Sequence, residues 1–277
     1  MTDPTGYDPT TFAGSAAHYL RGRAPYAADL VAIVARELGL DGTGRLLDVG
    51  SGPGVLAVPL APLFAQVVAL EPDHDMLVEA GRHAAASGVG PLGRVRAVAE
   101  ALPLRGPFRA VTFGQSFHRT AGAPVAEAVY DLLEPGGAIV LIGPDAGVRP
   151  RTAGPGDPPI PDDEVQDLIR RYLGPRRRMG QGFTPTEPWG RFEEVLARTR
   201  FGPPVTVVAP GREDVTRDVD GVISGYLSMS YAAPHLFGDR LDAFVADLRR
   251  LLEGRTTTGR FRDWPGDTDV VIGRKET

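Results

Sequence analysis

The chain of 277 residues contains no cysteine. This absence excludes structural disulfides, thiolate ligands for zinc or iron–sulfur clusters, and a thiol nucleophile. Lys275 is the only lysine and asparagine is missing, so Schiff-base lysine chemistry and N-glycosylation are not expected either. A large part of enzyme chemistry is therefore closed to this protein.

Long hydrophobic runs are also lacking. No apolar run reaches the roughly 18 residues that a membrane-spanning helix requires. The start of the chain, MTDPTGYDPTTF, has no basic segment followed by an apolar one. The net charge of −5 does not favour nucleic acid as a partner. We therefore expect a cytoplasmic protein that binds neither nucleic acid nor a membrane, and the sequence gives no prediction of its oligomeric state.

Short apolar segments alternate with helical patterns along most of the chain. Strands are predicted at residues 45–50, 66–71, 94–98, 108–115, 138–143, 205–209 and 269–273. Helices are predicted at residues 26–40, 54–64, 73–87, 123–133, 162–173, 189–199, 215–228 and 235–252. This alternation is typical of an α/β protein with a Rossmann-like, doubly wound, mostly parallel sheet.

Insertions are predicted to add a helical cap to this sheet. Residues 1–143 are expected to form N-terminal helices and the ligand-binding core. Residues 144–182 begin with a segment dense in proline and glycine, PDAGVRPRTAGPGDPPIPDDE, and are expected to form a lid insertion. Residues 183–277 are expected to return to the core, interrupted by a cap insertion at residues 213–253.

The most informative segment is LLDVGSGPGV, at residues 46–55, where a predicted strand runs into glycines and then a helix. Glycines at such a turn let the backbone approach a ligand closely. The spacing is G-x-G-x-G, not the G-x-G-x-x-G of a dinucleotide site, and no G-K-[ST] follows. A nucleoside without a pyrophosphate fits this loop better, and an ordinary tight turn is the alternative.

Glu71 ends the next predicted strand, about 20 residues after the glycine loop, where a carboxylate can accept both hydroxyls of a ribose. Alone, it would be interpreted as a solvated acid at the end of a strand. Together with the glycine loop, it indicates a nucleoside site.

Five motifs in order carry a family resemblance: LLDVGSGPG, VVALEPDHDML, AVAEALPL, AVTFGQSFHR and LLEPGGAIVLIG. They resemble the class I S-adenosylmethionine-dependent methyltransferases, of the methyltransferase-11-like, small-molecule type. The resemblance covers residues 16–143. Beyond them, GYLSMSYAAPHLFGDRLDAF is weakly similar to a segment of bacterial members that carry a helical cap.

The resemblance implies S-adenosylmethionine as the cofactor, with most of its contacts at strand ends. Asp48 would support the loop, and Gly50, Ser51, Gly52 and Gly54 would pass beneath the methionine part. Glu71 would hold the ribose hydroxyls, with Pro72 and Met76 flanking the adenine. Ala99 and Glu100 would lie near the adenine edge, although Val98 stands where the family usually has an acid.

Two further regions complete the implied cofactor site. The segment HYLRGRAPY is similar to the family's Tyr-x-x-x-Arg segment and places Tyr19 and Arg23 over the cofactor carboxylate, which suits an always-charged arginine. Either could equally be a surface residue. Gln115 lies at the end of the fourth predicted strand, where open parallel sheets bind ligands.

His118 follows the same strand and is the best candidate for a general base, because imidazole titrates near neutrality. The alternative is a histidine that only shapes the cofactor site. No metal site is expected, because His74 and His83 have no acid–histidine cluster around them. Methyl transfer relies on positioning and exclusion of water, so a metal is optional. The family's N-P-P-[YFW] motif is absent where GQSF stands, which disfavours planar amide acceptors.

The predicted lid carries one dense basic cluster, made up of Arg170, Arg171, Arg176, Arg177 and Arg178. It is interpreted as a solvated face, or alternatively as a site for an anionic or carrier-bound substrate. Aromatic and hydroxyl residues of the cap are candidates for an acceptor pocket or for core packing: Tyr172, Phe183, Trp189, Tyr226, Ser228 and Tyr231.

We therefore predict methyl transfer from S-adenosylmethionine to an oxygen, nitrogen or carbon nucleophile of a small molecule, in specialised metabolism. One alternative is a relative that binds S-adenosylmethionine without methylating, since fold alone does not fix function. The other is a nicotinamide-dependent oxidoreductase, which the glycine spacing disfavours.

Overall fold

The computed structural model describes residues 7–144, 156–176, 178–179, 182–183, 191–211, 215–263 and 266–277. Its strands are β1 Arg45–Val49, β2 Gln66–Leu70, β3 Gly93–Val95, β4 Phe108–Gly114, β5 Leu133–Pro144, β6 Arg178–Met179, β7 Gly182–Phe183, β8 Val205–Ala209, β9 Thr216–Asp218, β10 Arg260–Arg262 and β11 Thr268–Arg274. Its α-helices are α1 Ala16–Gly22, α2 Leu30–Leu38, α3 Ala57–Leu60, α4 His74–Ala86, α5 Ala123–Leu132, α6 Asp162–Leu173, α7 Phe192–Leu196, α8 Val219–Leu227 and α9 Leu241–Glu253.

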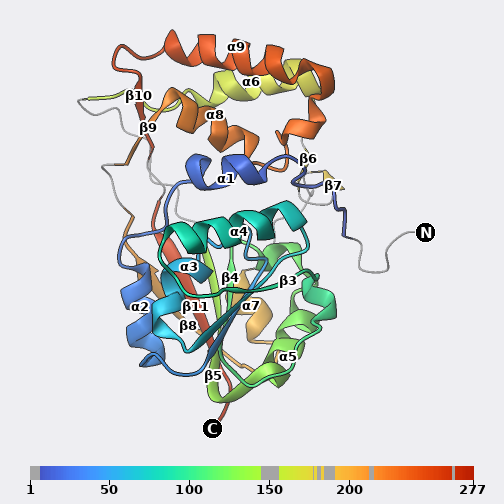
Figure 1. Cartoon of the computed structure of the whole chain (residues 1–277), viewed down its shortest axis with the longest axis vertical. Coiled ribbons are helices and arrows are strands. Elements are labelled where there is room, and N and C mark those ends of the chain that lie inside the picture. The colour runs from blue at the N-terminus through green and yellow to red at the C-terminus, as the bar shows by residue number, and fades with distance from the viewer. Residues whose placement is uncertain are drawn as a thin grey trace.

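The main sheet has seven strands in the order β3-β2-β1-β4-β5-β11-β8 (Figure 1). The first five are parallel, whereas β11 runs antiparallel to both β5 and β8. The chain moves outward in one direction from β1 to β3 and then in the other from β4. Because the strand order reverses at β1 and β4, their carboxyl ends border a crevice. The predicted Rossmann-like, mostly parallel sheet is confirmed.

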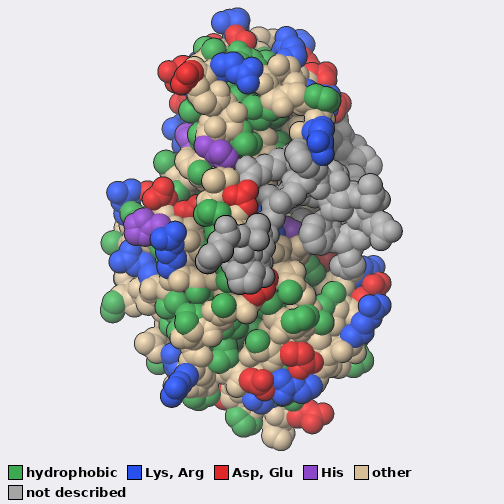
Figure 2. Space-filling view, turned by 90° about the vertical axis from the view of Figure 1, so that its right-hand side faces the viewer, with side chains coloured by type: hydrophobic (Ala, Val, Ile, Leu, Met, Phe, Trp, Pro, Cys, Tyr) green, Lys and Arg blue, Asp and Glu red, His purple; other side chains and the backbone are tan. Residues whose placement is uncertain are grey.

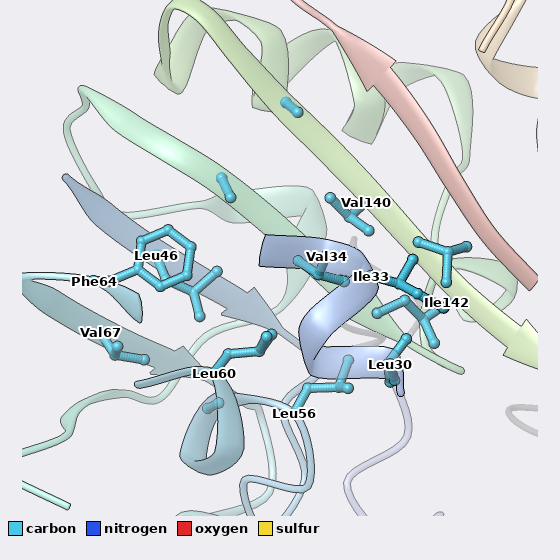
Figure 3. Packing of buried hydrophobic residues seen from close by; sticks show 14 of the residues in the cluster. Leu30, Ile33, Val34, Leu46, Leu56, Leu60, Phe64, Val67, Val140 and Ile142 are labelled. Atoms are coloured by element: carbon cyan, nitrogen blue, oxygen red, sulfur yellow. The ribbon is translucent and has the colours of Figure 1, made fainter. Parts of the chain in front are cut away.

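Helices cover both faces of this sheet. On one face, α2 places Leu30, Ile33 and Val34 against the sheet, where Val140 and Ile142 of β5 meet them (Figure 3). These three helical residues recur at a spacing of three to four, which puts them on a single stripe of the helix. On the other face, α5 and α7 pack against a second cluster of buried side chains. The central strands of the sheet are therefore buried on both faces, as their apolar sequences require.

A cap of helices lies above the crevice and has a core of its own. Helices α6, α8 and α9 pack together at the end of the molecule opposite the C-terminus (Figure 1). The fully buried rings of Phe244 and Phe261 belong to this core, and Phe237 stacks on Phe244 with ring centroids 4.0 Å apart. Strands β9 and β10, which α8 and α9 separate in the chain, form a two-stranded antiparallel sheet beside these helices. The boundaries proposed from the sequence for lid and cap stay predictions.

Helix α1 joins the cap to the core, since it contacts both α8 and α4. The contact with α8 is close because both helices carry glycine there: a Cβ on Gly22 would lie 2.3 Å from the backbone carbonyl carbon of Ser224. Just before α1, the Ser15 hydroxyl donates a hydrogen bond of 2.9 Å to the Leu227 carbonyl oxygen. The N-terminal segment is therefore held against the cap.

Several boundaries differ from the sequence prediction. Helix α1 was not predicted, because its residues AAHYLRG lack an extended apolar stripe. The helix predicted at residues 215–228 begins as strand β9, and the one predicted at 235–252 begins as two 3₁₀ turns before α9. The helix predicted at 54–64 is only α3 and one 3₁₀ turn. Strand β10, which pairs with β9, was not predicted. Part of the helix predicted at 189–199 lies outside the described residues.

Charged side chains of both signs are interspersed on the face that Figure 2 shows, over the core and over the cap. Within the described part of the chain, no helix is both long and apolar enough to cross a membrane.

Replacing Gly22 by alanine tests whether the contact between α1 and α8 holds the cap to the core. The added methyl group must displace backbone, so we expect the free energy of unfolding to fall by about 1–3 kcal/mol, the usual cost of overpacking. Urea denaturation measures this change. Gly90→Ala is the matched control, because a Cβ there meets no atom within 4 Å. Equal stability of the two variants would contradict the close packing.

Candidate functional site

Two adjoining cavities open at the carboxyl ends of β1, β2 and β4, beneath α1 and the cap. The first is lined by Tyr7, Thr11, Phe12, Tyr19, Arg23, Val49, Gly50, Gly52, Leu70, Glu71, Pro72, Met76, Val98, Ala99, Glu100, Gly114, Gln115, Ser116, His118, Arg119 and Thr120. The second is lined by Tyr19, Gly22, Arg23, Ala24, Tyr26, Asp48, Gly50, Ser51, Val55, Leu56, Gly114, Gln115, Arg217, Met229 and Asp263. Because five residues line both, the two cavities form one continuous site.

The glycine loop forms the floor shared by the cavities. Gly50 has a φ of 64° and Gly52 a φ of 53°, in the left-handed region that glycine adopts without strain. A Cβ on Gly50 would lie 2.6 Å from the Cβ of Ser116. A Cβ on Gly52 would meet no atom within 4 Å and would occupy space at the wall of the first cavity. Glycine therefore keeps this wall open to a ligand.

Glu71 links the glycine loop to the start of α4. One carboxylate oxygen accepts a hydrogen bond of 2.9 Å from the Gly52 N–H, and the other accepts one of 3.1 Å from the Asp73 N–H. Only 8% of Glu71 is exposed, and its burial raises the pKa of the carboxyl to about 7. Glu71 is therefore not a solvated acid at the end of a strand.

Asp48 lies beneath the loop and is 1% exposed. Its Oδ1 accepts a hydrogen bond of 2.7 Å from the Thr112 hydroxyl. Its buried Oδ2 has no hydrogen-bond partner among the described residues. Burial raises the pKa of this carboxyl to about 7 as well. The Ala57 N–H acts on the same carboxyl and lowers its pKa against the effect of burial, so Asp48 supports the floor of the second cavity from below.

Tyr19 and Arg23 stand together at the end of α1 and line both cavities. The Arg23 guanidinium lies over the Tyr19 ring, with Cζ 4.8 Å from the centroid, and donates a hydrogen bond of 3.0 Å to the Ser228 carbonyl oxygen. Its Nε is buried and has no hydrogen-bond partner in the described chain. Arg23 therefore brings a positive charge to the junction of the two cavities, which suits an anionic group.

The residues predicted to surround an adenine line one side of the first cavity. They are Pro72, Met76, Ala99 and Glu100, together with Val98. Met76 is 2% exposed and supplies an apolar surface. Glu100 accepts a hydrogen bond of 2.9 Å from the Ala121 N–H, so its carboxylate holds the loop that follows β4.

The end of β4 brings Gln115 and His118 to the cavities. Gln115 has a φ of 52°, and no other non-glycine residue in the described ranges has a positive φ. Such a backbone conformation is costly and is often found at functional sites. His118 lines the first cavity, where burial and the neighbouring Arg119 charge lower the pKa of its imidazole to about 4. His118 is therefore neutral at pH 7.

Of the predicted site residues, all but Gly54 line at least one cavity. Gly54 instead packs beside α3, where its Cβ would lie 3.1 Å from Val58. Sequence reasoning missed Tyr7, Thr11 and Phe12, which come from a small, polar N-terminal segment without a recognisable motif. It also missed Arg119, although Arg119 directly follows His118.

A buried ion pair from the cap was missed as well. Arg217 Nη2 lies 2.6 Å from Asp263 Oδ2, with the two side chains 14% and 12% exposed, and both residues line the second cavity. Arg217 also donates a hydrogen bond to the Gly22 carbonyl oxygen. Arg217 lies on β9 and Asp263 directly follows β10, so the two residues are far apart in the chain and no local sequence pattern connects them.

Of the cap residues considered for an acceptor pocket, the four whose side chains are described, Tyr172, Tyr226, Ser228 and Tyr231, line neither cavity. Tyr226 and Ser228 are buried, and Tyr172 and Tyr231 pack against the cap core, as the core-packing interpretation expects. In the basic cluster, Arg170 is paired with Asp167. Arg177 and Trp189 lie outside the described residues, and of Arg178 and Phe183 only the backbone is described. Among the residues that are described, no three His, Asp or Glu side chains are grouped to hold a metal ion.

Comparison with known proteins finds a family match over part of the chain. Residues 46–137 match the family described as "Methyltransferase domain". The match contains the glycine loop, Glu71, and the end of β4 with His118.

Two curated relatives match about half of the chain. A ubiquinone biosynthesis O-methyltransferase of Ruegeria pomeroyi is 32% identical over 160 residues, which cover 51% of this chain and 64% of that protein. A protein-L-isoaspartate O-methyltransferase of Methylorubrum populi is 34% identical over 148 residues, which cover 50% and 66%. The chain thus spans slightly less than two thirds of the length of these relatives.

Solved structures share the fold over nearly the whole chain. A methyltransferase from Thiobacillus denitrificans in complex with S-adenosylhomocysteine is 17% identical, with a TM-score of 0.52 and coverage of 95% of this chain and 96% of that one. The YjhP protein from E. coli is also 17% identical, with a TM-score of 0.52 and coverage of 97% and 100%. At these identities the likeness is one of fold.

The buried carboxyl of Asp48 predicts a specific pH dependence of stability. Its pKa rises from 3.8 to about 7 on folding, so the folded chain keeps this proton to a higher pH than the unfolded chain does. The free energy of unfolding therefore falls as the pH rises between these values, by at most about 1.4 kcal/mol per pH unit from one group.

We expect Asp48→Asn to make that fall smaller, which urea denaturation at pH 5, 6 and 7 can measure. Asp239→Asn, at an exposed position on the cap, is the control and should leave the slope unchanged. Identical slopes for Asp48→Asn and the parent would show that Asp48 is ionised over this whole range.

Proposed function

We propose that this chain, whose residues 46–137 form a class I S-adenosylmethionine-dependent methyltransferase domain, transfers a methyl group to an oxygen, nitrogen or carbon nucleophile of a small molecule. The observation that carries the proposal is the hydrogen bond between the Gly52 N–H and the Glu71 carboxylate. This bond brings an open glycine loop and a buried acid to one cavity wall.

The residues present fit S-adenosylmethionine. Gly50 and Gly52 leave the floor open for its methionine part, and Glu71 is placed for the ribose hydroxyls, because each carboxylate oxygen can accept a hydrogen bond beyond those it has. Arg23 and Tyr19, which line both cavities, are suited to the carboxylate end. Asp48 supports the loop from below. When bound, the cofactor supplies a methyl group on a positively charged sulfonium.

The adenine is proposed to lie between Pro72 and Met76, with Ala99 and Glu100 at its edge. Glu100 already accepts the Ala121 N–H, so a backbone group near Val98 is the better candidate for the adenine amine. Gln115, whose strained backbone lies where the two cavities meet, is placed at the junction of cofactor and acceptor.

Catalysis by this chain is proposed to rest on positioning and on exclusion of water, which together can supply most of the acceleration of a methyl transfer. The cap and α1 lie over the site, and Gly22 of α1 and Arg217 and Met229 of the cap line the second cavity. His118 enters this site as a neutral imidazole.

The lid and cap are proposed to choose the acceptor. The two curated relatives each match about half of this chain, yet their names refer to ubiquinone biosynthesis and to protein L-isoaspartate. Since a match of this extent is shared by proteins whose names refer to different substrates, acceptor choice is expected to depend on segments outside residues 46–137. Specialised metabolism, a cytoplasmic location and the absence of nucleic acid partners stay predictions.

The cofactor assignment is tested by ligand-induced stabilisation. S-adenosylhomocysteine should raise the melting temperature, since a ligand that binds only the folded state stabilises it. Glu71→Gln should weaken its binding by about 1.5–3 kcal/mol, the range for hydrogen bonds to charged groups. Calorimetry measures the affinity.

Glu276→Gln, at an exposed position near the C-terminus, is the matched control and should bind like the parent. A shift with NAD and none with S-adenosylhomocysteine would overturn the assignment. If a folded Glu71→Gln variant bound S-adenosylhomocysteine as tightly as the parent, Glu71 would not be a residue that binds the cofactor.

The role of His118 is tested with any acceptor that is turned over. A base whose pKa is about 4 takes up a proton poorly at pH 7, so we expect His118→Ala to lower kcat less than about tenfold. Turnover at saturating S-adenosylmethionine, together with the affinity for S-adenosylhomocysteine, separates catalysis from binding. A loss of about 10²–10⁴-fold in kcat with unchanged affinity would instead make His118 a general base.

A further inference from the structure

Arg119 is a cation of the first cavity for which the cofactor assignment has no use. It ends the 3₁₀ turn Phe117–Arg119 after β4 and lines the cavity beside His118. Among the residues that the structure describes, its guanidinium forms no hydrogen bond or ion pair; its contact is with the Phe12 ring, whose centroid lies 4.6 Å from Cζ. By contrast, the surface arginines Arg200 and Arg249 are paired with carboxylates.

The backbone that carries Arg119 is firmly placed. Phe117 is buried and packs edge-to-face on Phe113 and Phe192, with centroids 5.2 Å and 5.7 Å apart. The Ser116 hydroxyl donates a hydrogen bond of 2.6 Å to the Val49 carbonyl oxygen, and the Arg119 N–H donates one of 2.9 Å to the Ser116 carbonyl oxygen. The guanidinium is thus presented to the cavity by a turn fixed to the sheet.

No acid that lines the first cavity forms a hydrogen bond or ion pair with Arg119 among the described residues, although the charge of Glu71 acts on it. Glu71 accepts two backbone N–H groups, and Glu100 accepts the Ala121 N–H. Burial lowers the pKa of Arg119; Tyr19 and Glu71 act against this shift, and the charge of Arg23 acts with it. The guanidinium still stays charged at neutral pH. An anion in the cavity would offset the cost of this partly buried charge.

Arg23 and Arg119 differ in where they lie. Arg23 lines both cavities and reaches the second, where Asp48 and Ser51 of the glycine-loop region lie. Arg119 lines only the first. If Arg23 holds the carboxylate end of the cofactor, Arg119 remains available for an anion on a different molecule.

We infer that the methyl acceptor is a small organic acid whose carboxylate pairs with Arg119. A guanidinium matches a carboxylate with two parallel hydrogen bonds, which gives orientation as well as affinity. Phe12 and Tyr19 also line this cavity and offer aromatic surface to the body of the acid. The inference rests on the proposed function, because the acid is expected to bind next to the cofactor.

The test uses the full chain saturated with S-adenosylhomocysteine. Benzoate, phenylacetate and 3-phenylpropanoate place a carboxylate at increasing distance from a ring, and the corresponding primary amides are neutral analogues of the same shape. Calorimetric titration compares the parent with Arg119→Gln and Arg119→Lys. Arg45→Gln is the matched control, because Arg45 also lies over a phenylalanine ring but lines neither cavity.

At least one acid should bind the parent about 10- to 100-fold more tightly than its amide, as expected for hydrogen bonds to a charged group. Arg119→Gln should abolish this preference, Arg119→Lys should keep part of it, and Arg45→Gln should keep all of it. In every variant the affinity for S-adenosylhomocysteine should stay within about twofold of the parent value, because Arg119 is not assigned to the cofactor.

Three results would overturn the inference. Equal binding of acids and amides, or no saturable binding of any acid at millimolar concentration, would show that the cavity does not select carboxylates. Loss of S-adenosylhomocysteine affinity in Arg119→Gln would place Arg119 in the cofactor site. If the parent itself fails to bind S-adenosylhomocysteine, the proposed function fails and the inference falls with it.

Discussion

The rest of the site depends on one hydrogen bond, from the Gly52 N–H to the Glu71 carboxylate. It joins the loop after β1 to the residue after β2, beside the crevice between β1 and β4 where the strand order reverses. The bond requires Gly52 to adopt a left-handed backbone and requires Glu71 to be buried, which costs free energy when the carboxyl is ionised. The core stabilises both, because β1 and β2 are paired along their full length.

Several ionisable side chains of the site are buried, and burial shifts their pKa values. Asp48, Glu71, His118 and Arg119 all have pKa values moved toward their neutral forms, with burial as the first cause in each. Perturbed groups of this kind cluster where ligands bind, because a charged or polar ligand can provide the partner that the protein lacks.

The cap is part of this site and more than a cover for it. Helix α1 packs on α8 and is followed directly by Arg23, and the Gly22 carbonyl oxygen accepts a hydrogen bond from Arg217 of β9. Arg217 and its partner Asp263 form the far wall of the second cavity. Movement of the cap would therefore shift residues that line the cavity, which links acceptor access to the packing of the cap.

The sequence by itself determined the sheet, the glycine loop and the acid after β2, because buried parallel strands are continuous apolar runs and the loop follows directly from the first of them. It also determined which residues at the ends of β1, β2 and β4 meet. Only the tertiary structure decided that the Arg119 guanidinium pairs with no carboxylate among the described residues, that Phe12 of the N-terminal segment lies against it, and that Arg217 and Asp263 line the same site. Those contacts join segments far apart in the chain, and no local periodicity records the packing that brings them together.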